Sequence, residues 1–390
     1  MQIISWLFSV IGLFLSLWII VPAPNYFLLP LGVVMPEVSP WLVGINAIAL
    51  VIAVLQIDGG YLSFVLPVIS LLALGLSLRP LIQLPRVNQQ FASAMEQALG
   101  NNYLDEISEA VKSQMRSQPF ILVDMFRGID SSEVRILRGI NFASPDGVEL
   151  KLNTYRPLSP GKYPGIIIIY GGAWRQGSPN KYERFSCYMA ARGYTVIAID
   201  YRHAPKYQFP AQLEDVNTAL NYIREQANDL EVDVERLALL GRSAGGHLAM
   251  LAAYGSEAIG VKAVVNYYGP TNLVEGYREP PVPDPIDTRK VLENFLGGTP
   301  ESHLDLYQQA SPINYVKPNL PPSLFIYPER DHLVQAKYGR QIYDKLQTTD
   351  SLAILLTIPW AEHAFDAVFK GVSNQLALYY TERFIAWALK

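Results

Sequence analysis

The chain has 390 residues, of which 31 are Lys or Arg and 35 are Asp or Glu, so its formal net charge at pH 7 is −4. A nucleic-acid-binding surface needs concentrated positive charge, and this balance argues against nucleic acid as a partner. The only cysteine, Cys187, cannot form an internal disulfide, and the five histidines show no metal-ligand spacing such as His-Glu-x-x-His. We therefore expect no metal site.

The N-terminal region is almost free of charge. The first 78 residues contain only two charged side chains, Glu37 and Asp58. Each uncharged apolar run in this region approaches the roughly 20 helical residues that cross a bilayer core. We therefore expect a helical transmembrane region over residues 1–80, with three crossings favoured over two. The runs are Ile3–Val21, Trp41–Ile57 and Tyr61–Leu78, separated by proline-rich and Asp58-Gly59-Gly60 breaks.

A cleaved signal peptide followed by buried core helices is the alternative interpretation. A signal peptide normally begins with positive side chains, and Met1–Ser5 contains none. Arg79 and Arg86 follow the third run, so the positive-inside tendency places the C-terminal domain in the cytoplasm. Residues 81–119 are predicted to form a helical connector, either a helix pair on the soluble domain or a stalk lying on the membrane.

From about Phe120 onward, apolar runs alternate with stretches at helical spacing. The central runs are continuous and β-branched, as in Ile166–Ile169, which is typical of strands buried by helices on both faces. This alternation predicts an α/β domain over residues 120–390 with a mostly parallel sheet. The first two strands are joined by turn residues 144–147 and should be antiparallel. The predicted strands are Val134–Ala143, Val148–Tyr155, Gly165–Tyr170, Thr195–Tyr201, Leu237–Leu240, Val261–Tyr267, Ser323–Tyr327 and Ala353–Ile358, and the predicted helices are Lys181–Arg192, Ala211–Ala227, Gly246–Tyr254, Lys337–Gln347 and Asn374–Leu389.

The motif Gly241-Arg242-Ser243-Ala244-Gly245 lies between a predicted strand and a predicted helix. This is the setting of a nucleophile elbow, a sharp turn that presents a strained serine at the start of a helix. Gly241 and Gly245 are needed because side chains two residues from the serine would clash in so tight a turn. Ser243 is therefore the candidate nucleophile.

Three further sites follow the ends of predicted strands, where open α/β sheets place their active sites. Tyr170-Gly171-Gly172-Ala173-Trp174 ends the isoleucine-rich strand, and its small residues let backbone N–H groups approach a ligand oxygen. Asp331 and His363 follow the last two strands. The order Ser243, Asp331, His363 is the order expected for a Ser-Asp-His triad on this type of fold.

These motifs together give the chain a family resemblance. From about residue 134 onward it resembles the esterase/lipase branch of the α/β-hydrolases, which includes hormone-sensitive-lipase-like and feruloyl-esterase-like hydrolases. The matching stretches are Tyr170–Trp174, Asp200–Pro205, Phe209–Ala211 and Ala310–Pro312. The family's usual oxyanion-loop histidine is Tyr170 here, and a glycine common three residues before the acid is Pro328.

The resemblance implies an α/β-hydrolase fold and a serine esterase or lipase that needs no cofactor. The expected mechanism uses Ser243 as nucleophile, His363 as base and Asp331 as orienting acid, with Gly171, Gly172 and Ala244 donating backbone N–H groups to the oxyanion. Residues 271–314 are expected to form a cap over the site. The substrate would be a small-molecule or lipid ester. A peptidase or amidase on the same triad and a non-catalytic binding module on a hydrolase fold are the alternatives.

The remaining polar residues near these motifs favour structural roles. His247, inside the helix after the nucleophile, is predicted to be a packed residue rather than the base. Arg202 is predicted to belong to a structural ion pair. Glu329 is the nearest rival of Asp331 as the acid, and Trp174 could line an acyl pocket or serve in packing.

Overall fold

The computed structural model describes residues 2–57, 60–130, 132–255 and 260–390. Its centre is an eight-stranded sheet in the order β1-β2-β4-β3-β5-β6-β7-β8. The strands β3 to β8 run parallel, and β1 and β2 form the antiparallel edge. The strands are β1 (Arg135–Ala143), β2 (Leu150–Arg156), β3 (Tyr163–Ile169), β4 (Thr195–Ile199), β5 (Val232–Arg242), β6 (Val261–Tyr267), β7 (Ser323–Pro328) and β8 (Ala353–Ile358).

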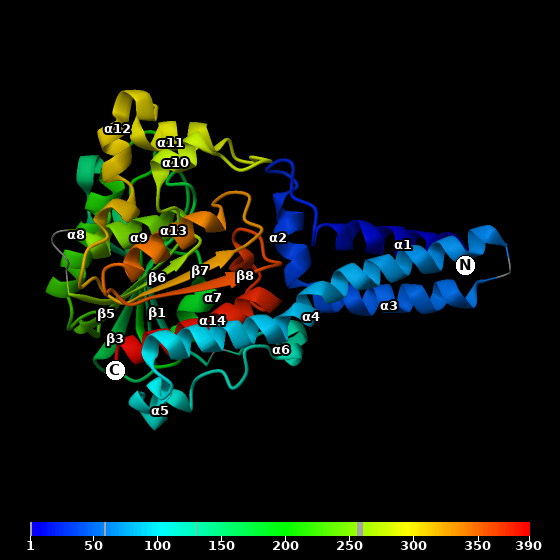
Figure 1. Cartoon of the computed structure of the whole chain (residues 1–390). Coiled ribbons are helices and arrows are strands. Elements are labelled where there is room, and N and C mark those ends of the chain that lie inside the picture. Colours follow the sequence, from blue (N-terminus) through cyan, green and yellow to red (C-terminus); the bar gives the residue numbers. More distant parts are fainter. Residues whose placement is uncertain (1, 58–59, 131, 256–259) are drawn as a thin grey trace.

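The predicted sheet is confirmed strand by strand, including the antiparallel start. The isoleucines of β3 are buried, because helices flank the sheet on both sides (Figure 1). The five predicted helices are also present, each within a few residues of its predicted bounds. They are α7 (Glu183–Ala190), α8 (Ala211–Glu225), α9 (Ala244–Tyr254), α13 (Ala336–Gln347) and α14 (Val372–Ala388). The mostly parallel sheet with flanking helices is the architecture of an α/β-hydrolase.

The N-terminal region forms four helices, three of which extend together away from the sheet (Figure 1). The helices are α1 (Gln2–Leu17), α2 (Leu29–Glu37), α3 (Ser39–Leu55) and α4 (Val65–Leu99). We call α1, α3 and residues 65–78 of α4 the N-terminal bundle. The short helix α2 lies between this bundle and the sheet (Figure 1). The predicted break at Asp58 and Gly59 lies outside the described residues, and η1 (Tyr61–Phe64) follows it.

The length and composition of the described N-terminal helices differ in how well they suit a bilayer. Only α4 is both long and apolar enough to cross a membrane as a single straight helix. The helices α2 and α3 meet at 81° and satisfy the same criteria together as one bent pair, while α1 is apolar but shorter. By length and composition alone, the described helices offer one candidate span, or two with the bent pair, fewer than the three crossings that the sequence favoured.

The helix α4 joins the bundle to the catalytic domain without interruption. It contains 35 residues and continues through Pro80 and Pro85, which at 1.5 Å per residue gives a length of about 50 Å. Its second half contributes Phe91 and Met95 to the core of the catalytic domain. The first part of the expected connector is thus a helix packed on the domain.

The rest of the connector differs from the expected helix. Residues 100–127 form only short turns, namely η2 (Tyr103–Glu106), α5 (Glu109–Lys112) and α6 (Leu122–Arg127). These short segments take the place of the second helix that we expected, and Tyr103 of η2 packs in the core of the catalytic domain.

Between β6 and β7 the chain forms the segment predicted as a cap. It contains α10 (Leu273–Arg278), α11 (Thr288–Leu296), α12 (Pro300–Gln309) and η4 (Pro312–Tyr315). Two further short turns are η3 (Pro145–Gly147), which joins β1 to β2, and η5 (Phe365–Ala367), which precedes α14. We use the name cap for residues 271–314.

Candidate active site

Ser243 occupies a sharp turn between β5 and α9. Its backbone has φ of 53° and ψ of −125°, a strained conformation for a residue with a side chain. A Cβ on Gly241 would lie 2.1 Å from the carbonyl oxygen of Gly245, and one on Gly245 would lie 2.0 Å from that of Ile169. Both glycines are therefore required, as predicted, although the second makes room for β3 rather than for its own turn.

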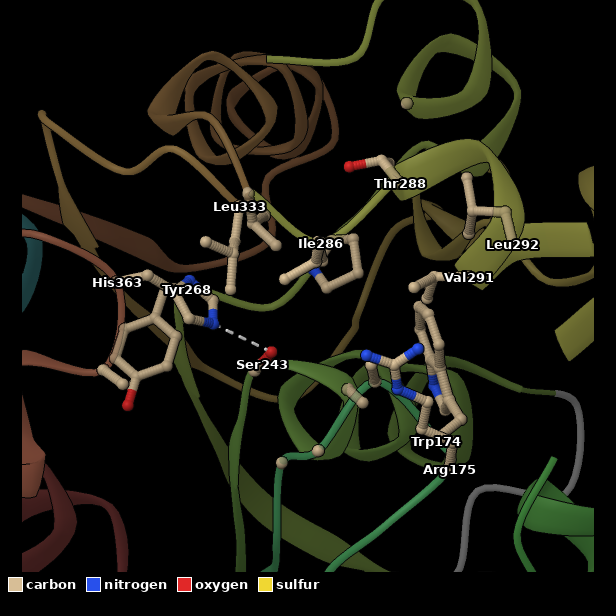
Figure 2. Close-up of a pocket in the computed structure, with 18 of the residues that line it drawn as sticks. Trp174, Arg175, Ser243, Tyr268, Ile286, Thr288, Val291, Leu292, Leu333 and His363 are labelled. Carbon is tan, nitrogen blue, oxygen red and sulfur yellow. Dashed lines mark hydrogen bonds between the residues drawn. The ribbon is translucent and has the colours of Figure 1, made fainter. Parts of the chain in front are cut away.

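The structure brings Ser243, His363 and Asp331 together, with the His363 ring between the other two side chains. His363 Nε2 lies 3.0 Å from Ser243 Oγ, and His363 Nδ1 lies 2.8 Å from Asp331 Oδ2. Figure 2 shows the first of these contacts at the floor of the pocket. Asp331 and His363 come from the loops after β7 and β8, so three strand ends supply one site.

The carboxyl group of Asp331 is held in a fixed orientation. Its Oδ1 accepts hydrogen bonds from the backbone N–H groups of Leu333, at 2.8 Å, and Val334, at 2.7 Å. Burial raises the pKa of Asp331, while His363 and the backbone donors oppose this increase. The rival acid Glu329 pairs instead with Arg340, away from His363.

The oxyanion loop after β3 lies against the elbow. A Cβ on Gly171 would lie 2.5 Å from the carbonyl oxygen of Arg242 and 2.9 Å from Ser243 Cβ, so only glycine permits this approach. Lys181 Nζ donates a hydrogen bond of 2.7 Å to the carbonyl oxygen of Gly171. Ala244 is the first residue of α9, and the N–H groups of a first helical turn have no acceptor within the helix. Gly171, Gly172 and Ala244 all line the pocket with Ser243.

Tyr170 takes the place of the family's histidine and is itself braced. Its hydroxyl donates to Asp200 Oδ1 and lies 2.9 Å from His203 Nε2. Its ring stacks on Tyr201 with the ring centroids 4.4 Å apart. Burial raises the pKa of Asp200, and the hydrogen bond from Tyr170 lowers it. The loop thus starts from a residue fixed by both stacking and hydrogen bonding.

Trp174 ends the oxyanion loop and joins it to the cap. Its ring stacks on Phe295 of α11 with the centroids 4.1 Å apart, and its Nε1 donates to His247 Nδ1 at 3.2 Å. His247 Nε2 lies 2.6 Å from the carbonyl oxygen of Ala310, and burial lowers the pKa of His247 to about 4. His247 is therefore a neutral, packed residue, as its position in the sequence predicted.

A buried polar cluster below the triad could not be predicted from the sequence. Arg242 pairs with Asp366, and the hydroxyl of Tyr268 donates to the same carboxylate. The ring of Tyr268 lies beside His363 with centroids 4.6 Å apart. Only the position of Arg242 inside the elbow motif could have drawn attention to this cluster. Arg202, in contrast, pairs with Asp215 as the structural ion pair that we expected.

The pocket above Ser243 encloses about 230 Å³ and is mainly apolar. The cap supplies Ile286, Val291 and Leu292, and the loop after Asp331 supplies Leu333 (Figure 2). Side chains of the N-terminal region also line it, a contribution that no sequence pattern indicated; they are Tyr26, Leu29 and Val33. Within the part of the chain that the structure describes, no group of three or more His, Cys, Asp or Glu side chains is arranged to hold a metal ion.

Comparison with known proteins identifies the family. Residues 152–346 match the BD-FAE family. The chain is 28% identical over 242 residues to the probable carboxylic ester hydrolase LipM of Mycobacterium tuberculosis, covering 58% of this chain and 54% of that protein. It is 29% identical over 264 residues to esterase LipQ of the same organism, covering 61% and 62%. The match thus spans little more than half of each relative's length.

A solved structure shows the same fold. The esterase Est2 of Thermogutta terrifontis superposes with a TM-score of 0.50 at 24% identity, covering 65% of this chain and 89% of that one. Since the family match covers half of the 390 residues, the chain belongs to the BD-FAE family, carried on an α/β-hydrolase fold.

Proposed function

We propose that the protein is a serine hydrolase that cleaves carboxylic esters and is anchored in a membrane. The observation that carries the proposal is the 3.0 Å contact between Ser243 Oγ and His363 Nε2, with Asp331 Oδ2 2.8 Å behind the same ring. The names of the two mycobacterial relatives support ester bonds as the substrate class.

The proposed reaction proceeds in two acyl-transfer steps. Ser243 Oγ attacks the ester carbonyl while His363 takes its proton, and Asp331 stabilises the resulting imidazolium. The N–H groups of Gly171, Gly172 and Ala244 bind the oxyanion. His363 returns the proton to the departing alcohol. It then takes a proton from the water molecule that attacks the acyl-enzyme, and gives this proton to Ser243 Oγ as the acyl–oxygen bond breaks and the acid leaves. Loss of one oxyanion donor commonly lowers kcat by about 10²–10³.

The polarity of the N-terminal bundle supports membrane anchoring. A water-soluble bundle turns polar side chains outward, whereas this one buries serines and an asparagine among small apolar residues and turns large apolar side chains outward. Asn46 Nδ2 donates to Ser16 Oγ at 2.9 Å and to Ser77 Oγ at 3.3 Å, linking all three helices of the bundle. The exposed side chains are large and apolar; they include Phe8, Ile11 and Phe14 of α1, Ile48 and Val51 of α3, and Val68 and Leu71 of α4. Such a surface is stable in lipid and costly in water.

We place the catalytic domain on the cytoplasmic side, because Arg79 and Arg86 follow the apolar part of α4. The test uses an exposed cysteine, Ser159→Cys, in a Cys187→Ala background. A membrane-impermeant maleimide should label it only after the cells are lysed. Labelling in intact cells would reverse the orientation.

A fluorophosphonate probe tests the catalytic proposal, because it reacts with activated serines. Wild-type protein should be labelled and should hydrolyse p-nitrophenyl butyrate, and Ser243→Ala should do neither. Hydrolysis of the matched anilide faster than the ester would favour the amidase alternative. Folded wild-type protein that is neither labelled nor active would favour a binding module.

A further inference from the structure

The N-terminal segment between α1 and α2 is part of the pocket, and not merely a link to the anchor. Tyr26, Leu29 and Val33 line the same cavity as Ser243 and His363. They face a pocket whose cap side is supplied by Ile286, Val291 and Leu292. The cavity above the serine therefore has apolar walls from two parts of the chain, and an acyl chain is the part of an ester that such walls favour.

This N-terminal wall is held firmly against the loops that carry the triad. Leu29 and Val33 form a buried cluster with Trp18 and Ala23, and Leu333 from the acid loop packs against it. Arg330, next to Asp331, donates a hydrogen bond to the carbonyl oxygen of Ile19. At the other end of α2, Glu37 Oε2 accepts a hydrogen bond of 2.8 Å from the backbone N–H of Ser373. The wall is thus fixed at both ends of the α2 region.

Exposed apolar side chains lie next in sequence to residues that line this pocket. Tyr26 is 59% exposed, and its neighbour Phe27 is 87% exposed. Across the pocket, Pro281 lines the cavity, and the adjacent Val282 is 90% exposed. The loop before α2 and the cap loop lie on the side of the catalytic domain from which the N-terminal bundle leaves (Figure 1). Aromatic rings are favoured at the level where helices enter a bilayer.

We propose that the segment from Tyr26 to Val33 is an acyl-binding wall, and that the substrate is a long-chain ester drawn from the bilayer through the rim formed by Phe27 and Val282. The proposal rests on the hydrolase function proposed above. The acyl chain passes from the lipid between the α2 wall and the cap, and the ester carbonyl reaches Ser243. Each buried methylene adds about fourfold to the binding of the chain, so the wall selects for chain length.

Chain-length profiles of the full-length protein in phosphatidylcholine vesicles test the wall. The measured quantity is the ratio of kcat/KM for p-nitrophenyl laurate to that for p-nitrophenyl acetate. Val33→Trp places a larger side chain in the space beside the wall, where the acyl chain would lie, and should lower this ratio at least tenfold. Val34→Trp is the matched control, because Val34 is on the same helix and does not line the pocket; it should keep the wild-type ratio. If Val33→Trp does not fold, Leu29→Ala replaces it and should lower the ratio at least fivefold.

Substitutions at the rim test whether the ester enters from the bilayer. Phe27→Glu and Val282→Glu should lower turnover of a diacylglycerol embedded in the vesicles at least fivefold relative to turnover of the soluble acetate ester. Leu304→Glu is the control, because Leu304 is exposed on α12, far from the bundle (Figure 1).

The outcomes separate this inference from the proposed function. Equal ratios in the wall variants and the wild type, or a wild-type preference for acetate, would overturn the acyl wall while leaving the hydrolase intact. An effect of the wall variants without any effect of the rim variants would mean that the long-chain ester enters from solution. Absence of both labelling and turnover in the wild type would instead refute the hydrolase itself.

Discussion

Tyr170→Phe would show whether the tyrosine at the start of the oxyanion loop replaces the bracing function of the family's histidine. The substitution keeps the ring, which stacks on Tyr201 at 4.4 Å, and removes only the hydroxyl. That hydroxyl donates to the half-buried carboxylate of Asp200, which is left with its backbone donor at Tyr201, 2.9 Å away. The pKa of Asp200, already raised by burial, should rise further.

The size of the effect follows from the charged acceptor. A hydrogen bond to a charged group contributes about 1.5–3 kcal/mol, so the melting temperature should fall on the order of 5 °C. The loss of kcat has an upper limit of about 10²–10³, the effect of losing an oxyanion donor altogether. We expect kcat for p-nitrophenyl butyrate to fall about tenfold, with KM nearly unchanged, because the loop acts on the transition state.

Two measurements on the same protein decide the result, namely thermal unfolding and steady-state kinetics. A variant that is less stable but has wild-type kcat would limit Tyr170 to folding. A variant equal to the wild type in both would refute the proposed brace. Tyr201→Leu removes the stacking partner together with the 3.0 Å hydrogen bond from the Tyr201 hydroxyl to the carbonyl oxygen of Tyr170. Tyr201→Phe removes that hydrogen bond alone, so the difference between the two variants isolates the stacking.

Three further predictions concern other parts of the site and its support. Gly171→Ala places a methyl group against the elbow and should lower kcat by about 10²–10³, measured with p-nitrophenyl butyrate; an active variant would contradict the close approach. Lys181→Met removes the charged donor to the Gly171 carbonyl and should lower kcat at least roughly tenfold, whereas unchanged kinetics would make Lys181 a surface residue only. Burial raises the pKa of Glu37 from 4.5 to about 8, so its stabilising contribution is complete below pH 4.5 and is lost as the pH rises towards 8. Melting temperatures measured from pH 5 to 8 should therefore fall less in Glu37→Gln than in the wild type. An equal fall of the melting temperature with pH in both proteins would contradict the raised pKa of Glu37.

The sheet and the proximity of Ser243, His363 and Asp331 could be predicted because their signals are local. Each strand of the parallel sheet is a short apolar run. The three residues proposed to form the triad each come shortly after such a run. Ser243, Asp331 and His363 therefore needed no knowledge of distant contacts, only of where parallel strands end. The glycines of the elbow were predictable for the same reason, although Gly245 makes room for Ile169 on a neighbouring strand, which the motif alone does not show.

The parts that could not be predicted depend on contacts between distant segments. The spacing of Leu104, Ile107 and Val111 fits a helix, yet the segment forms only η2 and α5, and Tyr103 packs into the catalytic core. The pairing of Arg242 with Asp366 joins residues 124 positions apart. The wall formed by Leu29 and Val33 depends on how α2 docks against a loop roughly 300 residues later, which no periodicity encodes.

The hydrogen bond between Glu37 and Ser373 has a consequence for how the protein is made. Its partners are separated by 336 positions, so it forms only after the ribosome has synthesised α14. By then the N-terminal bundle has long left the ribosome, because domains generally fold in the order in which they are synthesised. The α2 wall of the pocket is therefore complete only in chains whose α2 has docked against α14. Chains in which α2 has not yet docked lack one wall of the pocket, so under the function proposed above they would bind a long-chain ester less well than the completed fold.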